Sequence, residues 1–399
     1  MSGPAWRLAL AAALLMALAS GNRGALGLLI GPLNGASGLG LGTLSFVAAL
    51  GQLGVGIAQP LVGHWSDRHG AARVIVAGAA LLALATALPV WSVAPASVTL
   101  SLLAGAVAAS AVGSNGVLVG EVNRRLGTAR AGIAVGLIGA GASLGQMLLG
   151  PLTQWLIDER GWPAALLVLA ALALLAWPLA LAWRHGPGPA PRAPARPTWR
   201  DLQGPLRDTR FWQAAGSFGV CGFHVGFLAV HMPGVIERCG LPASLAGPWI
   251  AVAGAANMLG SVAVGAALRR HDPGALLVGL YLLRALAIAA LLVLPASAPA
   301  MLGFALLMGA SHMATLPPTT QLVARAHGVE RLGLLFGVVM LVHQAGCFAG
   351  IWLGGVLAQA SGSDRTLWLI DIALALAAAA LVRPRTSARR REQAVQQGA

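Results

Sequence analysis

Apolar residues along this chain form long runs that are separated by short polar or charged segments. Twelve runs can be delimited, at residues 8–30, 44–62, 74–91, 98–120, 131–157, 163–183, 211–236, 245–268, 273–294, 299–323, 332–359 and 367–382. A helix that crosses a membrane needs roughly 20 mostly apolar residues, and nearly all of the runs approach or exceed that length. Strands of a membrane barrel are shorter and alternate between apolar and polar positions, which these runs do not. The pattern therefore predicts an all-α polytopic membrane protein with twelve transmembrane helices.

The composition excludes several classes of protein. Of the 399 residues, 57% are apolar and only 10% are charged, whereas a soluble domain is about a quarter charged. Such a chain cannot cover its surface with ions, which argues against a disordered protein or an ordinary cytosolic enzyme. The sequence shows no nucleotide-binding motif, metal-ligand spacing or nucleophile–base arrangement. We therefore expect neither an enzyme nor a protein with a metal or another cofactor.

The formal net charge of +14 would suit a nucleic-acid partner, but the positions of the charges indicate topology instead. If the N-terminus is cytoplasmic, 21 Arg lie in cytoplasmic segments, and only Arg160, Arg238 and Arg365 lie in the opposite loops. This excess follows the positive-inside rule for membrane proteins. We therefore expect a multi-pass protein of a bacterial-type inner membrane, with both termini in the cytoplasm and no nucleic-acid partner.

A break rich in Pro and Arg at residues 184–210 divides the runs into six and six. We predict that it is a flexible or partly extended cytoplasmic linker. It separates an N-terminal six-helix bundle, residues 1–183, from a C-terminal six-helix bundle, residues 211–382. A basic cytoplasmic tail is predicted at residues 383–399.

The two halves align with each other at a nearly constant offset. Pro32 and Pro233 are 201 positions apart, and three glycines of the fifth run precede three glycines of the eleventh run by 205. The glycine pairs are Gly141 with Gly346, Gly145 with Gly350, and Gly150 with Gly355. The offset suggests a duplication and predicts two pseudo-symmetric bundles with a site near the midplane between them.

The segment between the second and third runs resembles the loop signature of the major facilitator superfamily, G-x-x-x-D-R-x-G-R-R/K. The matching positions are Gly63, Asp67, Arg68 and Gly70. Alanines replace the basic pair that the signature expects next, and Arg73 follows them. The resemblance implies the major facilitator fold and transport by alternating access. It also implies that the loop is a gate in which Asp67 accepts hydrogen bonds from helix N-termini and pairs with Arg until the halves rock apart.

A finer resemblance is to bacterial members related to monocarboxylate and oxalate–formate transporters. The segments that carry it are Asn22-Arg23-Gly24, Gly141–Gln146, His231-Met232-Pro233, Pro317-Pro318-Thr319 and His343-Gln344. It implies a small organic acid as substrate, moved with a proton or in exchange. The branch often carries an Arg on the eighth helix, where this chain has Asn257.

Arg23 lies some fifteen residues into the first run, near the middle of the membrane. A charge at this depth is costly and usually faces a cavity or a partner. No Asp or Glu lies well inside the first eleven runs, so a substrate anion is a natural partner for its planar guanidinium. The alternative is a structural Arg that stabilises a helix break at Gly21 and Gly24.

His224 aligns with Arg23 in the second half, and His231 lies on the same face of the seventh helix two turns later. We expect Arg23 and His224 to line one cavity from opposite walls, although buried packing would also explain either histidine. The remaining predicted substrate-binding residues are His343, Gln344, Asn257, Asn115 and Gln146.

Arg284 and Asp371 are the other deep charges, on the ninth and twelfth runs. We predict a buried structural ion pair between them, with substrate contact by Arg284 as the alternative.

The function that fits these features is a secondary active transporter that moves a small organic anion, a carboxylate, across the inner membrane by alternating access. The expected partners are the substrate, the lipid bilayer and, if transport is coupled, protons; we expect a monomer. A drug or sugar exporter of the same fold is the main alternative, and a non-transporting membrane sensor is a remote one.

Overall fold

The computed structural model of the chain describes residues 3–126, 128–183, 203–328 and 331–383, and all regular elements in these ranges are helices. The first half contains α1 (Gly3–Gly24), α2 (Leu26–Ser37), α3 (Leu41–His69), α4 (Ala71–Trp91), α5 (Pro95–Val112), α6 (Asn115–Leu126), α7 (Thr128–Arg160), α8 (Trp162–Leu174), α9 (Ala176–Ala180) and the 3-10 turn η1 (Leu181–Trp183). The second half contains η2 (Pro205–Arg207), α11 (Thr209–Arg238), η3 (Ala243–Leu245), α12 (Ala246–Ala267), α13 (Pro273–Val293), α14 (Ala298–Ser311), η4 (Met313–Thr315), α15 (Leu316–His327), α16 (Leu332–Ser361) and α17 (Arg365–Leu381).

Each predicted apolar run corresponds to one helix or to a helix that is interrupted within its length. Ten helical stretches in the described ranges are long and apolar enough to cross a membrane. The other two runs correspond to α7, which has 33 residues, and α17, which has 17. The predicted all-α architecture with twelve membrane-spanning segments is confirmed.

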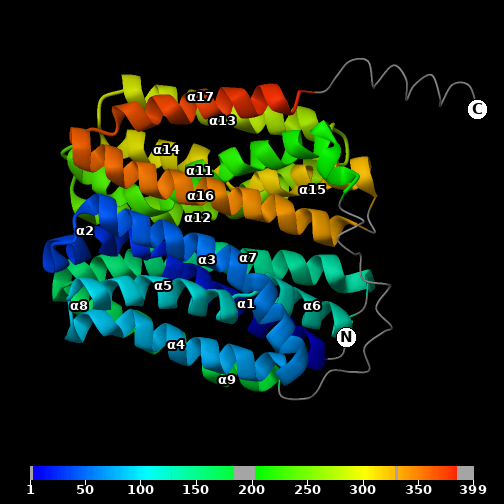
Figure 1. The fold of residues 1–399 in the computed structure, drawn as a ribbon, viewed down its shortest axis with the longest axis horizontal. Coiled ribbons are helices and arrows are strands. Elements are labelled where there is room, and N and C mark those ends of the chain that lie inside the picture. The colour runs from blue at the N-terminus through cyan, green and yellow to red at the C-terminus, as the bar shows by residue number, and fades with distance from the viewer. Residues whose placement is uncertain (1–2, 127, 184–202, 329–330, 384–399) are drawn as a thin grey trace, which may run out of the picture.

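The helices form two bundles, as Figure 1 shows: α1 to α9 lie in the lower part of the view and α11 to α17 in the upper part. The beginning of α1 and the end of α17 lie at the same end of the molecule (Figure 1), as an even number of crossings requires. Five buried hydrophobic clusters fill the described parts of the bundles, three mainly in the N-terminal half and two mainly in the C-terminal half.

The two bundles repeat the same close helix pair. In each half the fifth segment, α7 or α16, packs against the first, α1 or α11, so tightly that a Cβ added to its glycines would meet the backbone of the neighbouring helix. The contacts are Gly141 with Ala13, Gly145 with Ala17, Gly346 with Gly219, and Gly350 with Phe223. Small residues allow such close approach in membrane helices. The equivalent contacts show that the predicted pseudo-symmetry is present.

Four membrane segments in the described ranges are interrupted within their length. The first bends at Ala25 between α1 and α2, the fourth at Gly113 and Ser114 between α5 and α6, the sixth at Leu175 between α8 and α9, and the tenth at His312 between α14 and η4. The Ser114 hydroxyl accepts a hydrogen bond from the Val117 N–H at 3.4 Å and so caps α6. Interruptions at this depth are tolerated where protein groups satisfy the freed backbone atoms.

The fourth membrane segment is longer than predicted. Its run was expected to end at residue 120, but α6 continues to Leu126, and Glu121 is buried with 5% of its surface exposed. The statement that acids are absent from the inside of the early segments is therefore corrected at Glu121. Most of the predicted linker, and the tail after residue 383, lie outside the described residues, so these domain boundaries stay predictions.

Candidate functional site

The two bundles touch closely at one end of the molecule, the end where α3 begins and α16 ends. There the Gly42 N–H donates a hydrogen bond of 2.6 Å to the Gln359 side chain. A Cβ added to Gly355 would meet Ser45, and one added to Gly150 would meet Ile250. Ser45 and Ile250 are themselves 205 positions apart, so the repeat extends to this contact. The two bundles are therefore in direct contact at this end, where α3 and α16 also line an outward-facing pocket of about 620 Å³.

Amide side chains join the bundles farther along the same helices. Gln52 on α3 donates a 3.0 Å hydrogen bond to the Gln344 carbonyl oxygen on α16. Asn257 on α12 donates one of 3.1 Å to the Ser143 hydroxyl on α7. Gln344 and Asn257 are each 7% exposed. The predicted site residues Asn257 and Gln344 therefore lie between the bundles, and both are already engaged with the opposite half.

Toward the other end the four helices at the interface lose these close contacts. A Cβ added to any of six glycines on α3, α7, α12 and α16 would meet no atom within 4 Å. These glycines are Gly63, Gly136, Gly139, Gly265, Gly333 and Gly337. The close contacts between the bundles thus lie at the end that carries Gly42, which we call the closed end, and these glycines make none at the end that carries the loop around Gly70, which we call the open end.

Arg23 lies where these two regions meet. Gly27, one helical turn later, abuts the backbone of Ala229 on α11, so this face of the first segment is directed at the C-terminal bundle. Helical side chains lean toward the N-terminal end of their helix, which here is the open end. The Arg23 Nε is buried and has no hydrogen-bond partner, and no described residue forms an ion pair with Arg23. A cation without an acceptor therefore lies beside the bend at Ala25.

Of two other predicted site residues, Gln146 and Asn115, the structure describes the side chain of Gln146 only. Gln146 on α7 lies against Gly24, since a Cβ added to this glycine would be 3.1 Å from Gln146 Cγ. Gln146 also approaches Gly254 on α12, at 3.6 Å from such a Cβ, which places it beside Arg23 and between the bundles. The side chain of Asn115 lies outside the described part of the chain.

His224 does not line a cavity opposite Arg23, and that expectation is corrected. Its side chain is 1% exposed and lies inside the C-terminal bundle. His224 Nε2 is 3.0 Å from the Asp371 backbone oxygen and 3.4 Å from Asp371 Oδ1. His224 Nδ1 is 3.5 Å from Nη1 of Arg284. The reason is the rotation of α11, which turns this position toward α13 and α17 rather than toward α1.

The predicted direct pair of Arg284 and Asp371 is also corrected, because His224 lies between the two. Arg284 is 1% exposed and directs its donors elsewhere. Its Nη2 donates to the backbone oxygens of Ser311 at 2.6 Å and His312 at 3.1 Å, and its Nε donates to the Ser311 hydroxyl at 3.1 Å. These carbonyls belong to the C-terminal end of α14, where a cation is favoured by the helix dipole and by the unpaired carbonyls.

The other two predicted histidines lie in the contact between α11 and α16. His231 is 2.7 Å from the Ile351 backbone oxygen through Nε2 and stacks on Phe227 with the ring centroids 5.6 Å apart. His343 lies against Phe218 with a centroid distance of 4.5 Å. His231 is 3% exposed, so in this conformation it packs helices together and does not face the space between the bundles.

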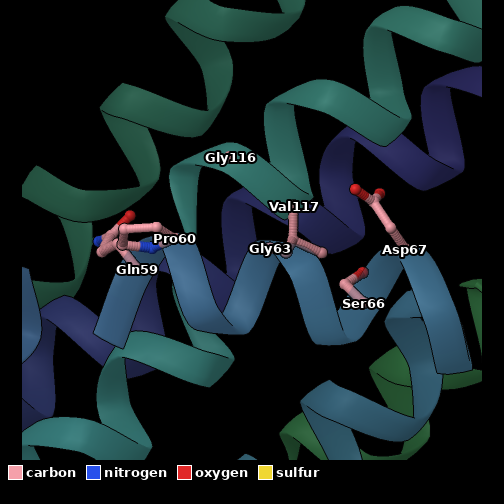
Figure 2. Close-up of a pocket in the computed structure, with 7 residues that line it drawn as sticks. All are labelled: Gln59, Pro60, Gly63, Ser66, Asp67, Gly116 and Val117. Carbon is pink, nitrogen blue, oxygen red and sulfur yellow. The ribbon is translucent and has the colours of Figure 1, made fainter. Parts of the chain in front are cut away.

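The loop that resembles the family signature borders a pocket of about 390 Å³ at the open end. Figure 2 shows its lining, which is Gln59, Pro60, Gly63, Ser66 and Asp67 on α3 and Gly116 and Val117 at the start of α6. Asp67 is exposed, as are Arg68 and Arg73. Among the described residues none forms an ion pair with Asp67. Gly70 ends α3 with φ of +88°, a conformation that only glycine adopts readily.

Several polar residues at these sites were not predicted. Gln52 interrupts the second apolar run, and this interruption is the sequence signal that could have identified it as a functional residue. Ser143 stands in one of the segments that carry the finer resemblance, but nothing in the sequence distinguished it as a partner of Asn257. Cys221 on α11 accepts a 3.3 Å hydrogen bond from Arg284.

Comparisons with known proteins agree with this architecture. Residues 12–351 match the family described as the Major Facilitator Superfamily. Two similar solved structures are of a bacterial homolog to the human lysosomal transporter Spinster, inward-facing and either unoccupied or occupied. Their TM-scores are 0.74 and 0.71, both are 14% identical, and the matches cover 96% and 94% of this chain and 95% of each of those chains. No curated protein matches the chain.

Proposed function

The chain belongs to the major facilitator superfamily and is a membrane transporter rather than an enzyme, and from this premise we propose that its substrate is a small organic anion. A carboxylate would bind between the two bundles and cross the membrane by alternating access. The single observation that carries the substrate class is Arg23, a cation in the middle of the first segment whose buried Nε has no acceptor among the described residues.

The surroundings of Arg23 support an anion as its missing partner. An isolated guanidinium at this depth is costly unless it is paired. A carboxylate can accept two parallel N–H bonds from it, and such charge-assisted bonds are the strong ones. Gln146, beside Gly24, offers amide donors and acceptors for the remaining polar atoms of a small ligand. Arg23 would thus supply the charge recognition, and Gln146 and Gln344 the orientation.

We also propose a role for the loop from Gly63 to Arg73. In the conformation that is open at its end, Asp67 is exposed and unpaired among the described residues. Closure would bring this end of α3 toward the start of α16, where Arg331 precedes the helix. Asp67 could then accept hydrogen bonds from the N-terminal backbone and pair with Arg, which would stabilise the closed state.

The setting of the protein is proposed on the same basis. The distribution of Arg favours a bacterial-type inner membrane with the open end and both termini on the cytoplasmic side. The conformation described here would then be inward-facing. A monomer is proposed because two bundles with one site between them form a complete transport unit.

A polyhydroxylated ligand such as a sugar is the second candidate. The observation in its favour is the set of neutral amides between the bundles, including Gln52 and Gln344. Amides pair with hydroxyl groups without a charge. This candidate assigns Arg23 the structural role of stabilising the bend at Ala25.

Thermal unfolding of the purified protein in detergent distinguishes the candidates. The panel contains small mono- and dicarboxylates, neutral sugars and cationic amphiphiles, because a ligand that binds the folded state raises its stability by mass action. We expect carboxylates to stabilise the parent protein and to lose this effect in Arg23→Gln. Arg23→Lys should also bind poorly, since an ammonium lacks the planar fork.

Arg269→Gln is the matched control, because Arg269 is an exposed residue in the turn after α12. It should retain the stabilisation of the parent. Undiminished carboxylate binding by folded Arg23→Gln, or stabilisation by sugars or cations alone, would contradict the anion proposal.

A further inference from the structure

The C-terminal bundle contains a buried acid, one oxygen of which has no hydrogen-bond partner in the described part of the chain. Asp371 on α17 is 1% exposed, and its Oδ1 has no hydrogen-bond partner. The one basic group within ion-pair distance among the described residues is His224 Nε2, at 3.4 Å. A buried carboxylate without partners is costly as an ion. Binding of a proton at Oδ1 removes that charge.

The contacts of His224 fix which of the two groups takes up a proton. Arg has only N–H donors, so Nη1 of Arg284 can only donate to His224 Nδ1. Nδ1 is then unprotonated, and Nε2 carries the hydrogen and donates it to the Asp371 backbone oxygen at 3.0 Å. This tautomer is assigned from the hydrogen-bond pattern. The ring is therefore neutral, and the free proton acceptor in the cluster is Asp371 Oδ1.

The other titratable groups around Asp371 are held by partners of their own. On α13, the Tyr281 hydroxyl donates to the Ser217 backbone oxygen at 2.5 Å. On α11, Cys221 lies 3.2 Å from the Thr315 hydroxyl. On α16, His343 Nδ1 and Cys347 Sγ are 3.6 Å apart. His312 lies at the break after α14. Arg284 is the permanent charge of this described cluster, so protonation of Asp371 changes its net charge from zero to one positive.

Arg284 connects this cluster to the contact between the bundles. Its Nη2 holds the backbone oxygens of Ser311 and His312 at the break. The next residue, Met313, donates its N–H to Asn257 Oδ1 at 2.9 Å. The Asn257 amide donates in turn to the Ser143 hydroxyl on α7 at 3.1 Å. Hydrogen bonds and one peptide link thus run from the acid on α17 to the N-terminal bundle.

We propose that Asp371 is a proton-binding site that couples transport to protons, and that the chain through His224, Arg284, the break at His312 and Asn257 transmits its protonation to the contact between the bundles. The inference rests on the proposed transport function but not on the nature of the substrate. The proton comes from water at the open end and forms an O–H bond at Oδ1, and it leaves again to water when the site is reached from the other side.

The coupling follows from the balance of charges around Arg284. While Asp371 is ionised, its negative charge attracts Arg284 toward α17. Once Asp371 is neutral, the carbonyls at the end of α14 are the remaining negative partners of the guanidinium. The break at His312 and the Asn257 bond to Ser143 then respond to the protonation state, which biases the equilibrium between open and closed conformations.

Infrared difference spectra of the purified full-length protein test the site without any substrate. Lowering the pH should produce the C=O band of a protonated buried carboxyl in the parent. The band should be lost in Asp371→Asn. Asp364→Asn is the matched control, because Asp364 lies at the start of the same helix and pairs with Arg238 at 2.7 Å away from the cluster; it should keep the band.

Spin labels test the transmission. The labels are attached at Trp65 and Val262, which are 50% and 69% exposed on opposite bundles. The exposed Cys239 is replaced by Ser, and the buried Cys221 and Cys347 are kept. The distance distribution of the parent should shift between neutral and mildly acidic pH. The shift should vanish in Asp371→Asn, and Asn257→Ala should lose the shift but keep the infrared band.

A band that persists in Asp371→Asn, or a pH-dependent shift in Asp371→Asn equal to that of the parent, would overturn the proposal. If Asp371→Asn does not fold, the double variant Arg284→Gln with Asp371→Asn removes both charges and carries the same test. Because neither measurement contains a substrate, failure here leaves the anion proposal standing. Failure of the carboxylate screen likewise leaves the proton site untouched.

Discussion

The two bundles share their backbone packing but differ in what they do with a buried Arg. The close pairs α1–α7 and α11–α16 use equivalent glycines. In the N-terminal bundle, Arg23 lies at the contact between the halves, and its buried Nε has no acceptor among the residues that the structure describes. In the C-terminal bundle, Arg284 lies inside the bundle with acceptors from Ser311, His312 and Cys221.

This difference separates two uses of a charge in a membrane. A satisfied Arg contributes to the stability of its own bundle, and its removal leaves acceptors unpaired. An unsatisfied Arg contributes little to the fold and is available for a ligand. His224, which the sequence alignment matched with Arg23, shows the same contrast: Arg23 is directed at the other bundle, whereas His224 makes its hydrogen bonds within its own bundle. The predictions that follow test this contrast.

The largest effect is expected from Arg284→Gln. The change leaves Asp371 without its balancing cation and frees the carbonyls at the end of α14. Breaking a buried, compensated charge typically costs about 3–5 kcal/mol, so the free energy of unfolding should fall by about that amount. Thermal unfolding and chemical denaturation in the same detergent measure it.

Arg23→Gln is the comparison, because it removes a charge that has no acceptor in the described structure. Its free energy of unfolding should change by less than about 1 kcal/mol or increase. Adding Asp371→Asn to Arg284→Gln should recover part of the lost stability. Equal destabilisation by Arg23→Gln and Arg284→Gln would contradict the division between a ligand charge and a structural charge.

The next largest loss of stability is expected at the glycine contacts, the feature that the two bundles share. Gly346→Val should press its side chain into the Gly219 backbone and destabilise the protein by about 1–3 kcal/mol. Gly141→Val, at the equivalent contact with Ala13, should have a similar cost. Gly337→Val, on the same helix as Gly346 but with no atom near its Cβ, is the control and should change stability little. A large difference between the two equivalent sites would show that the bundles do not share this packing in solution.

Much of this fold follows from the sequence alone. The number of membrane segments depends on the length and spacing of apolar runs, and both are read directly from the chain. The repeat was visible in the offset between Gly145 and Gly350, and close packing of both residues against the first helix of their bundle is the physical cause of that signal. The extension of α6 to Leu126 was missed, because polar residues there end the apolar run without ending the helix.

The candidate site was less predictable, and His224 shows why. Its depth was predicted correctly, but its alignment with Arg23 was not. The equivalent glycine contacts relate α1 to α11 by 206 positions, so Arg23 corresponds to Ala229, and the rotation of α11 turns His224 toward α17. That rotation depends on the packing of the whole bundle. The sequence identified Arg284 and Asp371 as deep charges, yet it could not show that an imidazole separates them. Partners such as Gln52 and Ser143 are ordinary polar residues whose role exists only once two helices meet.

A smaller effect is expected at the contact between the bundles. Gln344→Leu leaves the Gln52 amide without its acceptor, and a lost hydrogen bond of this kind is worth about 1 kcal/mol. The population of the conformation described here should therefore fall about fivefold relative to the alternative. Spin labels on opposite bundles measure this shift. Gln213→Leu, on α11 and without a hydrogen bond in the described structure, is the control. An equal shift in this variant would show that the hydrogen bond between Gln52 and Gln344 does not stabilise this conformation.

The smallest effect on stability is expected from Asp67→Asn, at the open end. Asp67 is exposed and borders the pocket that Figure 2 shows. With no ion pair to lose among the described residues, the free energy of unfolding of this conformation should change by less than about 0.5 kcal/mol. The contrast is with Asp364→Asn, which breaks the Arg238 pair at the closed end and should cost about 1 kcal/mol or less.

The effect of Asp67→Asn should appear instead in the conformational equilibrium. If Asp67 acquires its partners only when the open end closes, the substitution weakens the closed state alone. The distance between labels at Trp65 and Val262 should then remain in the open distribution under conditions in which the parent also populates a shorter one. Transport in vesicles should slow while carboxylate binding by Arg23 remains, because the binding region and this loop lie in different parts of the molecule. A variant that closes and transports like the parent would show that the loop is a positively charged connection and not a gate.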